Sequence, residues 1–423
     1  MTDRIDREAL SAARESARQR YEEFASSGLK LDITRGKPCS AQLDLSEDML
    51  VALEPGDHIA EEGDTRNYGG APKGLKALRE IFAPLVDVPV DQLVARDNSS
   101  LSLMHFCLVS SFFHTLPGGE KPWAGEKVRF LAPAPGYDRH FALCEELGIE
   151  LIQVGMTPEG PNMDEVEAFV AADPTIKGIW CVPKYNNPMG MTFGDEVVER
   201  LASMTTAAPD FRVYWDNAYA VHDLTAEPDE LASILDACAR AGNPDRAFVF
   251  ASTSKVTFAG GGVSFFGSSL ANVEWFLARD AMRSIGPDKV NQLRHVRFFG
   301  DSDGVRAHMQ RHREILEPKF ESVAKALATD LGALGIAEWS EPNGGYFVSL
   351  DVVPGTAKRV VQLAKEAGVA LTPAGATFPG GADLADRNIR IAPSFPTTEE
   401  LEQALDVLTT CVVLAAGEKI LDE

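Results

Sequence analysis

The chain has 423 residues, of which 45% are hydrophobic and 24% are charged. This composition is typical of a globular protein and excludes a disordered or collagen-like chain. The length exceeds that of one ordinary domain, so we expect two. The 63 acidic residues outnumber the 40 basic ones, which gives a net charge of −23. Because no basic patch interrupts this excess, we expect neither nucleic-acid nor anionic-membrane partners.

The six cysteines stand singly, without a C-x-x-C pair or histidines at zinc spacing. They predict buried, reduced thiols and no metal site. The N-terminal residues are charged from Asp3 onward and lack the apolar segment of a signal peptide. No apolar run reaches the length of a membrane span. We therefore expect a cytoplasmic protein.

Apolar spacing predicts an exposed N-terminal helix over residues 4–26 and an extended stretch over 30–38. Further along, short β-rich runs bounded by Gly and Pro alternate with longer helical patterns. Such alternation is typical of a mainly parallel sheet with helices on both faces. The runs lie at residues 128–133, 149–156, 177–183, 211–219, 247–255 and 261–269.

A long helical tract begins near Asp301 and leads into an α+β block of about 120 residues. We interpret this block as a second domain packed on the first. His308 and His312 lie four residues apart on the tract, and without a third ligand nearby we interpret them as surface residues. His140 lies near candidate ligand loops and is interpreted as a packed or hydrogen-bonded histidine.

In an open parallel sheet, ligands bind at the carboxyl ends of the strands, so the polar residues found there are candidates for a site. Lys255 follows one run and precedes three glycines, a setting that suits a Schiff-base lysine, a phosphate loop or an ordinary exposed lysine. Asp216 ends another run and could equally be a turn residue. Ser99 and Ser100 could cap a helix or bind phosphate at its N-terminus.

Seven short motifs occur together, and their order along the chain is informative. The set resembles the class I, fold-type I aminotransferases that use pyridoxal 5'-phosphate (PLP), and within them the bacterial aspartate aminotransferase subgroup. The resemblance covers nearly the whole chain. The motifs are R-N-Y-G at 66–69, N-S-S at 98–100, N-N-P-M-G at 186–190, D-N-A-Y at 216–219, S-T-S-K at 252–255, G-G-Y-F at 344–347 and N-I-R-I at 388–391.

The resemblance implies an α/β fold with two domains. The large PLP-binding domain would hold a mainly parallel seven-stranded sheet and comprise residues 46–300. A smaller α+β domain would combine residues 1–45, including the N-terminal helix, with residues 301–423.

The resemblance also implies roles for residues at the cofactor. Lys255 would form the internal aldimine and later move the substrate proton. Asp216 would pair with the pyridinium nitrogen and keep it protonated, so that the ring remains an electron sink. Asn187 and Tyr219 would hydrogen-bond the cofactor O3'.

The expected phosphate ligands are Ser99, Ser100 and Ser252. Tyr68 would reach the phosphate of a neighbouring subunit in a homodimer with shared active sites. Many relatives have a phosphate-binding arginine where this chain has Val263, so phosphate binding must rely on hydroxyls, helix N–H groups or another cation. A second departure is Ala134, which stands where a ring-stacking aromatic residue is usual, and Tyr137 is the expected substitute.

At the substrate, Arg390 would grip the α-carboxylate as a bidentate fork. Gly36, Asn187 and Arg35 are also expected to contact substrate. The cationic candidates for a side-chain carboxylate are Arg35, Lys289 and Arg294, each of which could instead form a surface or interdomain ion pair.

The expected activity is transamination between amino acids and 2-oxo acids, with aspartate and 2-oxoglutarate as the favoured pair. The alternatives on the same fold are an aromatic, branched-chain or alanine aminotransferase and a β-lyase, whose pockets would be apolar around the substrate side chain. A transcription regulator would need an N-terminal DNA-binding domain, for which the roughly thirty residues before LDITRGKP leave no room. A cofactor-free scaffold is disfavoured by the joint presence of Lys255, Asp216, Asn187, Tyr219 and Arg390.

Overall fold

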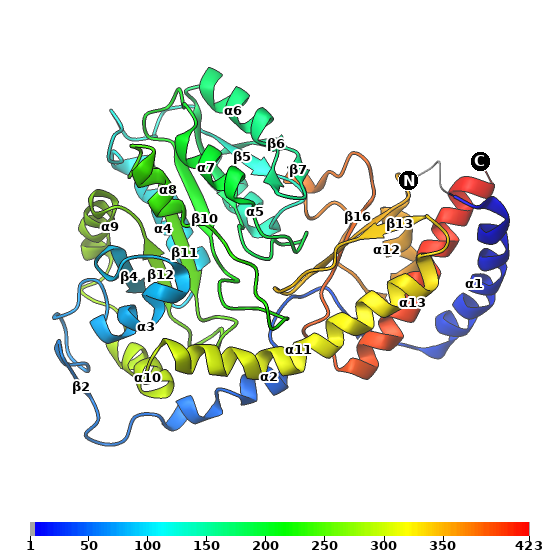
Figure 1. Ribbon diagram of the computed structural model, residues 1–423, viewed down its shortest axis with the longest axis horizontal. Helices are drawn as coiled ribbons and strands as arrows, with labels where there is room; N and C mark the ends of the chain where they lie inside the picture. Colours follow the sequence, from blue (N-terminus) through cyan, green and yellow to red (C-terminus); the bar gives the residue numbers. More distant parts are fainter. Residues whose placement is uncertain (1–4, 423) are drawn as a thin grey trace.

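A seven-stranded sheet forms the centre of the larger part of the molecule (Figure 1), in a computed structural model that describes residues 5–422. Its strand order is β4-β12-β11-β10-β9-β5-β6, and β12 alone runs antiparallel to its neighbours. The predicted α/β class with a mainly parallel seven-stranded sheet is confirmed. The strands are β4 (Leu93–Arg96), β5 (Arg129–Pro133), β6 (Glu150–Val154), β9 (Ile176–Cys181), β10 (Arg212–Asp216), β11 (Ala247–Ser252) and β12 (Ser264–Gly267).

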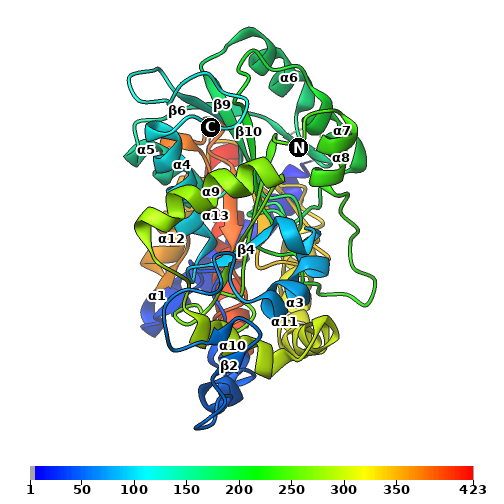
Figure 2. The same cartoon turned by 90° about the vertical axis from the view of Figure 1, so that its left-hand side faces the viewer.

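Both faces of this sheet are buried. Successive side chains on a strand point to opposite faces, so each strand contributes to two cores. On β10, Val213 and Trp215 enter one hydrophobic core and Tyr214 enters the other. Figure 2 shows α4 and α5 on one side of the strands and α7 and α8 on the other. The covering helices are α3 (Lys76–Val86), α4 (Ser100–Phe113), α5 (Asp138–Glu146), α6 (Met163–Ala172), α7 (Asp195–Ser203), α8 (Ile234–Arg240), α9 (Leu270–Arg283) and α10 (Lys289–Phe299).

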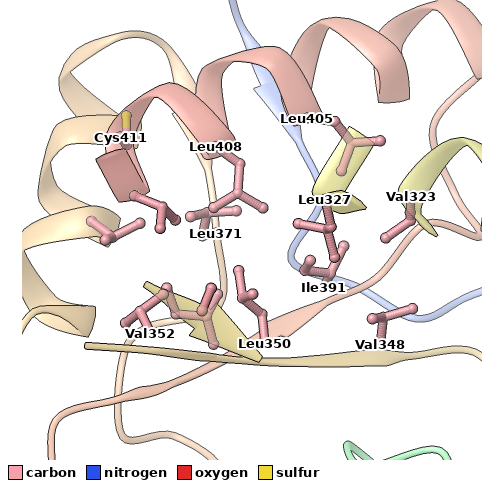
Figure 3. Packing of buried hydrophobic residues seen from close by; sticks show 14 of the residues in the cluster. Val323, Leu327, Val348, Leu350, Val352, Leu371, Ile391, Leu405, Leu408 and Cys411 are labelled. Atoms are coloured by element: carbon pink, nitrogen blue, oxygen red, sulfur yellow. The ribbon is translucent and has the colours of Figure 1, made fainter. Parts of the chain in front are cut away.

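A smaller antiparallel sheet of three strands lies beside the large one and has its own core. Figure 3 shows Leu350 of this sheet pointing toward Leu405 and Leu408 on the last helix, and all three are fully buried. The elements of this part are β13 (Ala337–Trp339), β14 (Val348–Val352), β16 (Asn388–Ile391), α1 (Arg7–Ser27), α11 (Ser302–Leu331), α12 (Ala357–Glu366) and α13 (Thr398–Leu421).

Helix α11 joins the two parts of the molecule. Its first turns place Val305 and Met309 in the core of the large sheet, whereas Val323 and Leu327 lie in the core of the small one. The division of the chain at residues 45/46 and 300/301 remains a prediction. The short elements are β1 (Leu31–Asp32), α2 (Ser40–Asp44), η2 (Glu47–Val51), β2 (Ile59–Ala60), β3 (Gly63–Asp64), η3 (Val90–Gln92), β7 (Met156–Thr157), β8 (Gly160–Pro161), β15 (Val369–Ala370) and η4 (Pro379–Gly381).

One expectation about exposure is wrong. His308 and His312 are buried, 5% and 1% exposed, because α2 and the loop after Lys255 pack on this face of α11. The predicted exposed N-terminal helix is confirmed as α1, most of whose residues are exposed, while Leu10 and Ala17 are completely buried and the helix packs on α13. Residue 4, its predicted first residue, lies outside the described range.

The six cysteines are free and buried, as predicted. Within residues 5–422, no helix combines the length and apolarity that a membrane crossing requires, and no three His, Cys, Asp or Glu residues are grouped as a metal site.

Candidate active site

A cavity of about 570 Å³ lies at the carboxyl ends of the central strands, between the two sheets. Three of the sequence candidates, Tyr68, Lys289 and Arg294, do not line this cavity, and the Tyr68 side chain is 82% exposed. The other candidates all line the cavity, namely Arg35, Gly36, Ser99, Ser100, Tyr137, Asn187, Asp216, Tyr219, Ser252, Lys255 and Arg390.

Asp216 is the last residue of β10 and lies at the base of the cavity. One carboxylate oxygen, Oδ2, is 3.0 Å from Nε2 of His140. The His140 ring is stacked on Trp180, with centroids 4.2 Å apart, which fixes its orientation. The other oxygen, Oδ1, is buried and has no hydrogen-bond partner among residues 5–422. A buried, unpaired carboxylate oxygen is costly, so this atom is suited to a cationic N–H donor from a ligand.

Lys255 follows β11 and lines the cavity, and its Nζ is 5.0 Å from the ring centroid of Tyr219. Burial lowers the pKa of the Lys255 ammonium below its ordinary value, and the negative charge of Asp216 acts in the opposite direction. Burial also holds the pKa of the Tyr219 hydroxyl well above its usual range. The Lys255 amine therefore loses its proton at a lower pH than an ordinary lysine does, beside a phenol that stays protonated.

The lowered pKa of Lys255 gives a testable pH dependence in the cofactor-free chain. Only the neutral amine is nucleophilic, so arylation of Lys255 should rise with pH and level off below the pH at which an ordinary lysine does. In Asp216→Asn the charge that favours the ammonium is absent, and we expect the profile to move to still lower pH. Mass spectrometry of the Lys255 peptide measures this rate. An unshifted profile, or a shift to higher pH in Asp216→Asn, would contradict the described electrostatics.

Ser99 and Ser100 lie at the N-terminus of α4, where the first N–H groups of a helix lack intrahelical partners. Ser99 is the N-cap residue, yet its hydroxyl makes no capping hydrogen bond. Ser252 lies opposite and donates to Ser254, 3.1 Å away. Free hydroxyls and free amides at a helix N-terminus form an anion-binding surface, so this end of the cavity suits a phosphate group.

Arg390 projects from β16 into the cavity and is 8% exposed. Its Nη1 donates to Oδ1 of Asn187 at 3.2 Å and to Oδ1 of Asp138 at 3.1 Å. The guanidinium lies over the ring of Phe347, 4.8 Å from the centroid. Gly36 permits this arrangement, since a Cβ at that position would come within 2.2 Å of the Phe347 ring.

Comparison with known proteins finds relatives that are all described as aminotransferases or transaminases. A family model described as aspartate amino-transferase matches residues 5–423. The chain is 49% identical over 416 residues to the aspartate aminotransferase of Corynebacterium glutamicum, covering 98% of this chain and 96% of that protein. It is 54% identical over 423 residues to a relative from Mycolicibacterium smegmatis, covering 99% of each. The chain belongs to the aspartate aminotransferase family. The crystal structure of an aspartate transaminase from C. glutamicum matches with a TM-score of 0.95 over 98% of each chain.

Membership of the aspartate aminotransferase family makes the chain a transaminase-type enzyme of PLP fold-type I, acting on amino acids and 2-oxo acids. A structure of α-aminoadipate aminotransferase from Thermus thermophilus, solved with N-(5'-phosphopyridoxyl)-L-leucine, shares the fold, with a TM-score of 0.71, 20% identity and coverage of 93% of this chain and 94% of that one. The residues of the cavity fit the family cofactor. Asp216 offers an open carboxylate oxygen to a ring N–H, Lys255 offers an amine, and Ser99 and Ser100 offer donors to a phosphate.

The two residues that depart from the family pattern, Val263 and Ala134, are both buried away from the cavity. Val263 is 2% exposed and packs in the core of the large sheet, so it offers the cofactor phosphate nothing. Ala134 is also buried, whereas Tyr137 lines the cavity with its ring edge against His140. Burial raises the pKa of Tyr137 to about 12. The stacking role of Tyr137 remains a prediction.

Of the three cations considered for a distal carboxylate, Arg35 alone lines this cavity. The Lys289 amine is bonded to the carbonyl oxygen of Gly69 at 2.6 Å, and Arg294 lines a separate cavity of about 500 Å³. Sequence reasoning missed Arg139, which lines the active-site cavity directly after Asp138. Its position two residues after Tyr137, at the start of the same helix, could have identified it as a site residue.

Proposed function

We propose that this enzyme is a PLP-dependent aminotransferase for dicarboxylic substrates, and that it converts aspartate and 2-oxoglutarate to oxaloacetate and glutamate. The observation that carries this proposal is the pair Arg35 and Arg139, which line the cavity in addition to Arg390. Neither has a carboxylate partner within residues 5–422, although the chain has 63 acidic residues. The aspartate aminotransferase name of the C. glutamicum relative supports the same substrate class.

Arg139 occupies an electrostatically unfavourable position. It lies in the first turn of α5, where the helix dipole disfavours a positive charge. A substrate carboxylate beside it would neutralise both the guanidinium and the helix end. An aromatic, branched-chain or alanine aminotransferase, or a β-lyase, needs no such cation beside the substrate side chain, and its pocket would be apolar there.

The residues that line the cavity have separate roles in the proposed transamination. When bound, PLP supplies an electron sink that stabilises negative charge at the substrate Cα. Arg390 holds the α-carboxylate and orients the Cα–H bond toward the Lys255 amine, which takes and returns the proton. Asp216 holds a proton on the ring nitrogen, and His140 keeps the Asp216 carboxylate in place. Asn187 and Tyr219, which line the cavity, would hold the ring by hydrogen bonds.

A second copy of the chain belongs to this proposal. Tyr68 is 82% exposed on its own subunit, and Ile59 of the nearby β2–β3 hairpin is 55% exposed. Burial of this segment against another copy would remove apolar surface from water and bring Tyr68 to the neighbouring phosphate site. We propose a homodimer with shared active sites on this basis.

Substitution of the two free arginines tests the dicarboxylate proposal. Arg139→Met and Arg35→Met remove the charges and keep apolar bulk. If one of them holds the distal carboxylate, its variant loses about 10- to 100-fold in kcat/KM for aspartate, and kcat/KM for alanine does not fall. Arg7→Met, an exposed change at the start of α1, is the matched control. Unchanged aspartate kinetics in both single variants and in the double variant would contradict the proposal that Arg35 or Arg139 binds the distal carboxylate.

A further inference from the structure

A buried hydrogen-bond network joins helix α2 to the peptide that carries Lys255. Gln42 of α2 is completely buried. Its side-chain nitrogen is 2.9 Å from the Tyr346 hydroxyl and 3.0 Å from Nδ1 of His312. The Tyr346 hydroxyl in turn is 3.5 Å from the carbonyl oxygen of Lys255. Gln42 is thus one side chain removed from the backbone of the reacting lysine.

The directions of the bonds to Gln42 and Tyr346 follow from the groups that donate them. The Cys39 N–H donates to Oε1 of Gln42 at 3.1 Å, so the amide nitrogen of Gln42 must face Tyr346 and His312. A carboxamide nitrogen only donates, so the Tyr346 oxygen accepts from Gln42 and its own proton is free to point at the Lys255 carbonyl. The same logic makes Nδ1 of His312 an acceptor.

The next peptide is held from the opposite side by α11. Nε2 of His308 is 2.8 Å from the carbonyl oxygen of Val256, 3.2 Å from the Ser46 hydroxyl and 3.1 Å from Nε2 of His312. Burial lowers the pKa of His308, and burial together with His308 lowers the pKa of His312 to about 3. Both rings are therefore neutral near neutral pH, and no buried charge disturbs the network.

The segment that ends in α2 also touches the substrate side of the cavity. Its β1 residues Leu31–Asp32 pair with β15 of the smaller part. Thr34, Arg35 and Gly36 then line the cavity, and α2 follows directly. One continuous segment thus runs from the small sheet past the substrate position to the Lys255 peptide.

We propose that Gln42 and Tyr346 are positioning residues that fix the Lys255 backbone, so that its amine lies within reach of the substrate Cα. A lysine side chain is long and flexible, and its tip is placed accurately only if its backbone is held. The carbonyl bond from Tyr346, oriented by Gln42, supplies this restraint. The proposal rests on the proposed function only in taking Lys255 as the reacting amine.

Two variants of the full chain test this role. Tyr346→Phe removes only the hydroxyl, and Gln42→Met removes the donor with little change in volume. We expect each to lower kcat with aspartate about tenfold while KM changes by less than about twofold. Because both act through one carbonyl, the double variant should lose no more than the larger single loss. Gln362→Met, an exposed glutamine on α12, is the control.

A second readout does not depend on turnover. Hydrogen–deuterium exchange of the cofactor-free chain should be faster over residues 252–258 in both variants and unchanged in Gln362→Met, with the protection of β10 retained. Unchanged exchange and unchanged kcat would overturn the proposal, as would a loss confined to KM. If the unsubstituted chain shows no transamination, the proposed function fails, and the exchange experiment still decides whether Gln42 and Tyr346 restrain this peptide.

Discussion

Lys255→Ala should abolish transamination, with kcat reduced by at least about 10⁴-fold. Lys255 is the lysine in the wall of the active-site cavity, opposite the open oxygen of Asp216, and burial keeps its pKa below the ordinary lysine value. Its loss removes both the amine that would bind the cofactor and the base that would move the Cα proton. Steady-state rates with aspartate, together with the visible absorption of the protein after addition of PLP, measure the effect.

The matched control for this variant is Lys325→Ala, at an exposed position of α11. It removes the same side chain and should retain full activity. Lys255→Arg adds a second comparison, because it keeps a positive charge but offers no neutral amine near neutral pH. Substantial turnover in either Lys255 variant would exclude Lys255 from the catalytic role.

Asp216→Asn should lower kcat by about 10³-fold while leaving the cofactor-free chain at least as stable. The substitution keeps the shape of the side chain and removes the charge that would hold a proton on the cofactor ring. In the cofactor-free chain, however, Oδ1 of Asp216 is a buried oxygen without a partner, so removal of its charge relieves a desolvation cost. Loss of activity without loss of thermal stability separates a functional role from a folding role.

Asp236→Asn provides the control for this charge, since Asp236 is exposed on α8. It should change neither the rate nor the absorption of bound PLP. A marked fall in the thermal midpoint of cofactor-free Asp216→Asn, with kcat preserved in the folded fraction, would show that Asp216 serves the fold and not the reaction.

The strands of the large sheet could be predicted because β-rich runs between Gly and Pro stand out from helical periodicity. The pattern did not reveal β4, whose four residues Leu93–Arg96 end in a charged side chain. Nor could it reveal the antiparallel direction of β12, since alternation along a strand is the same in either direction. Direction depends on the path of the chain between strands, which a local pattern does not contain.

The candidate site shows the same limit. Asp216 and Lys255 could be placed together because parallel strands end at one edge of a sheet. Arg390 reaches the same cavity from β16 of the antiparallel sheet, and only the family resemblance predicted its place. The charged residue Arg139 was missed because an arginine in the first turn of a helix is usually an ordinary surface side chain. The burial of His312 was not predicted because it depends on α2. That helix ends at Asp44, 268 residues before His312, so no local pattern connects them.

The most direct test of dicarboxylate transamination mixes the purified, PLP-loaded protein with single amino acids and follows its visible spectrum. We predict that aspartate and glutamate convert the bound cofactor to its pyridoxamine form, that oxaloacetate and 2-oxoglutarate reverse the change, and that alanine, leucine and phenylalanine act far more slowly. Conversion only by aromatic, branched or small amino acids would contradict the substrate assignment and the role of Arg35 and Arg139. Absence of any cofactor absorption would contradict the proposed use of PLP itself.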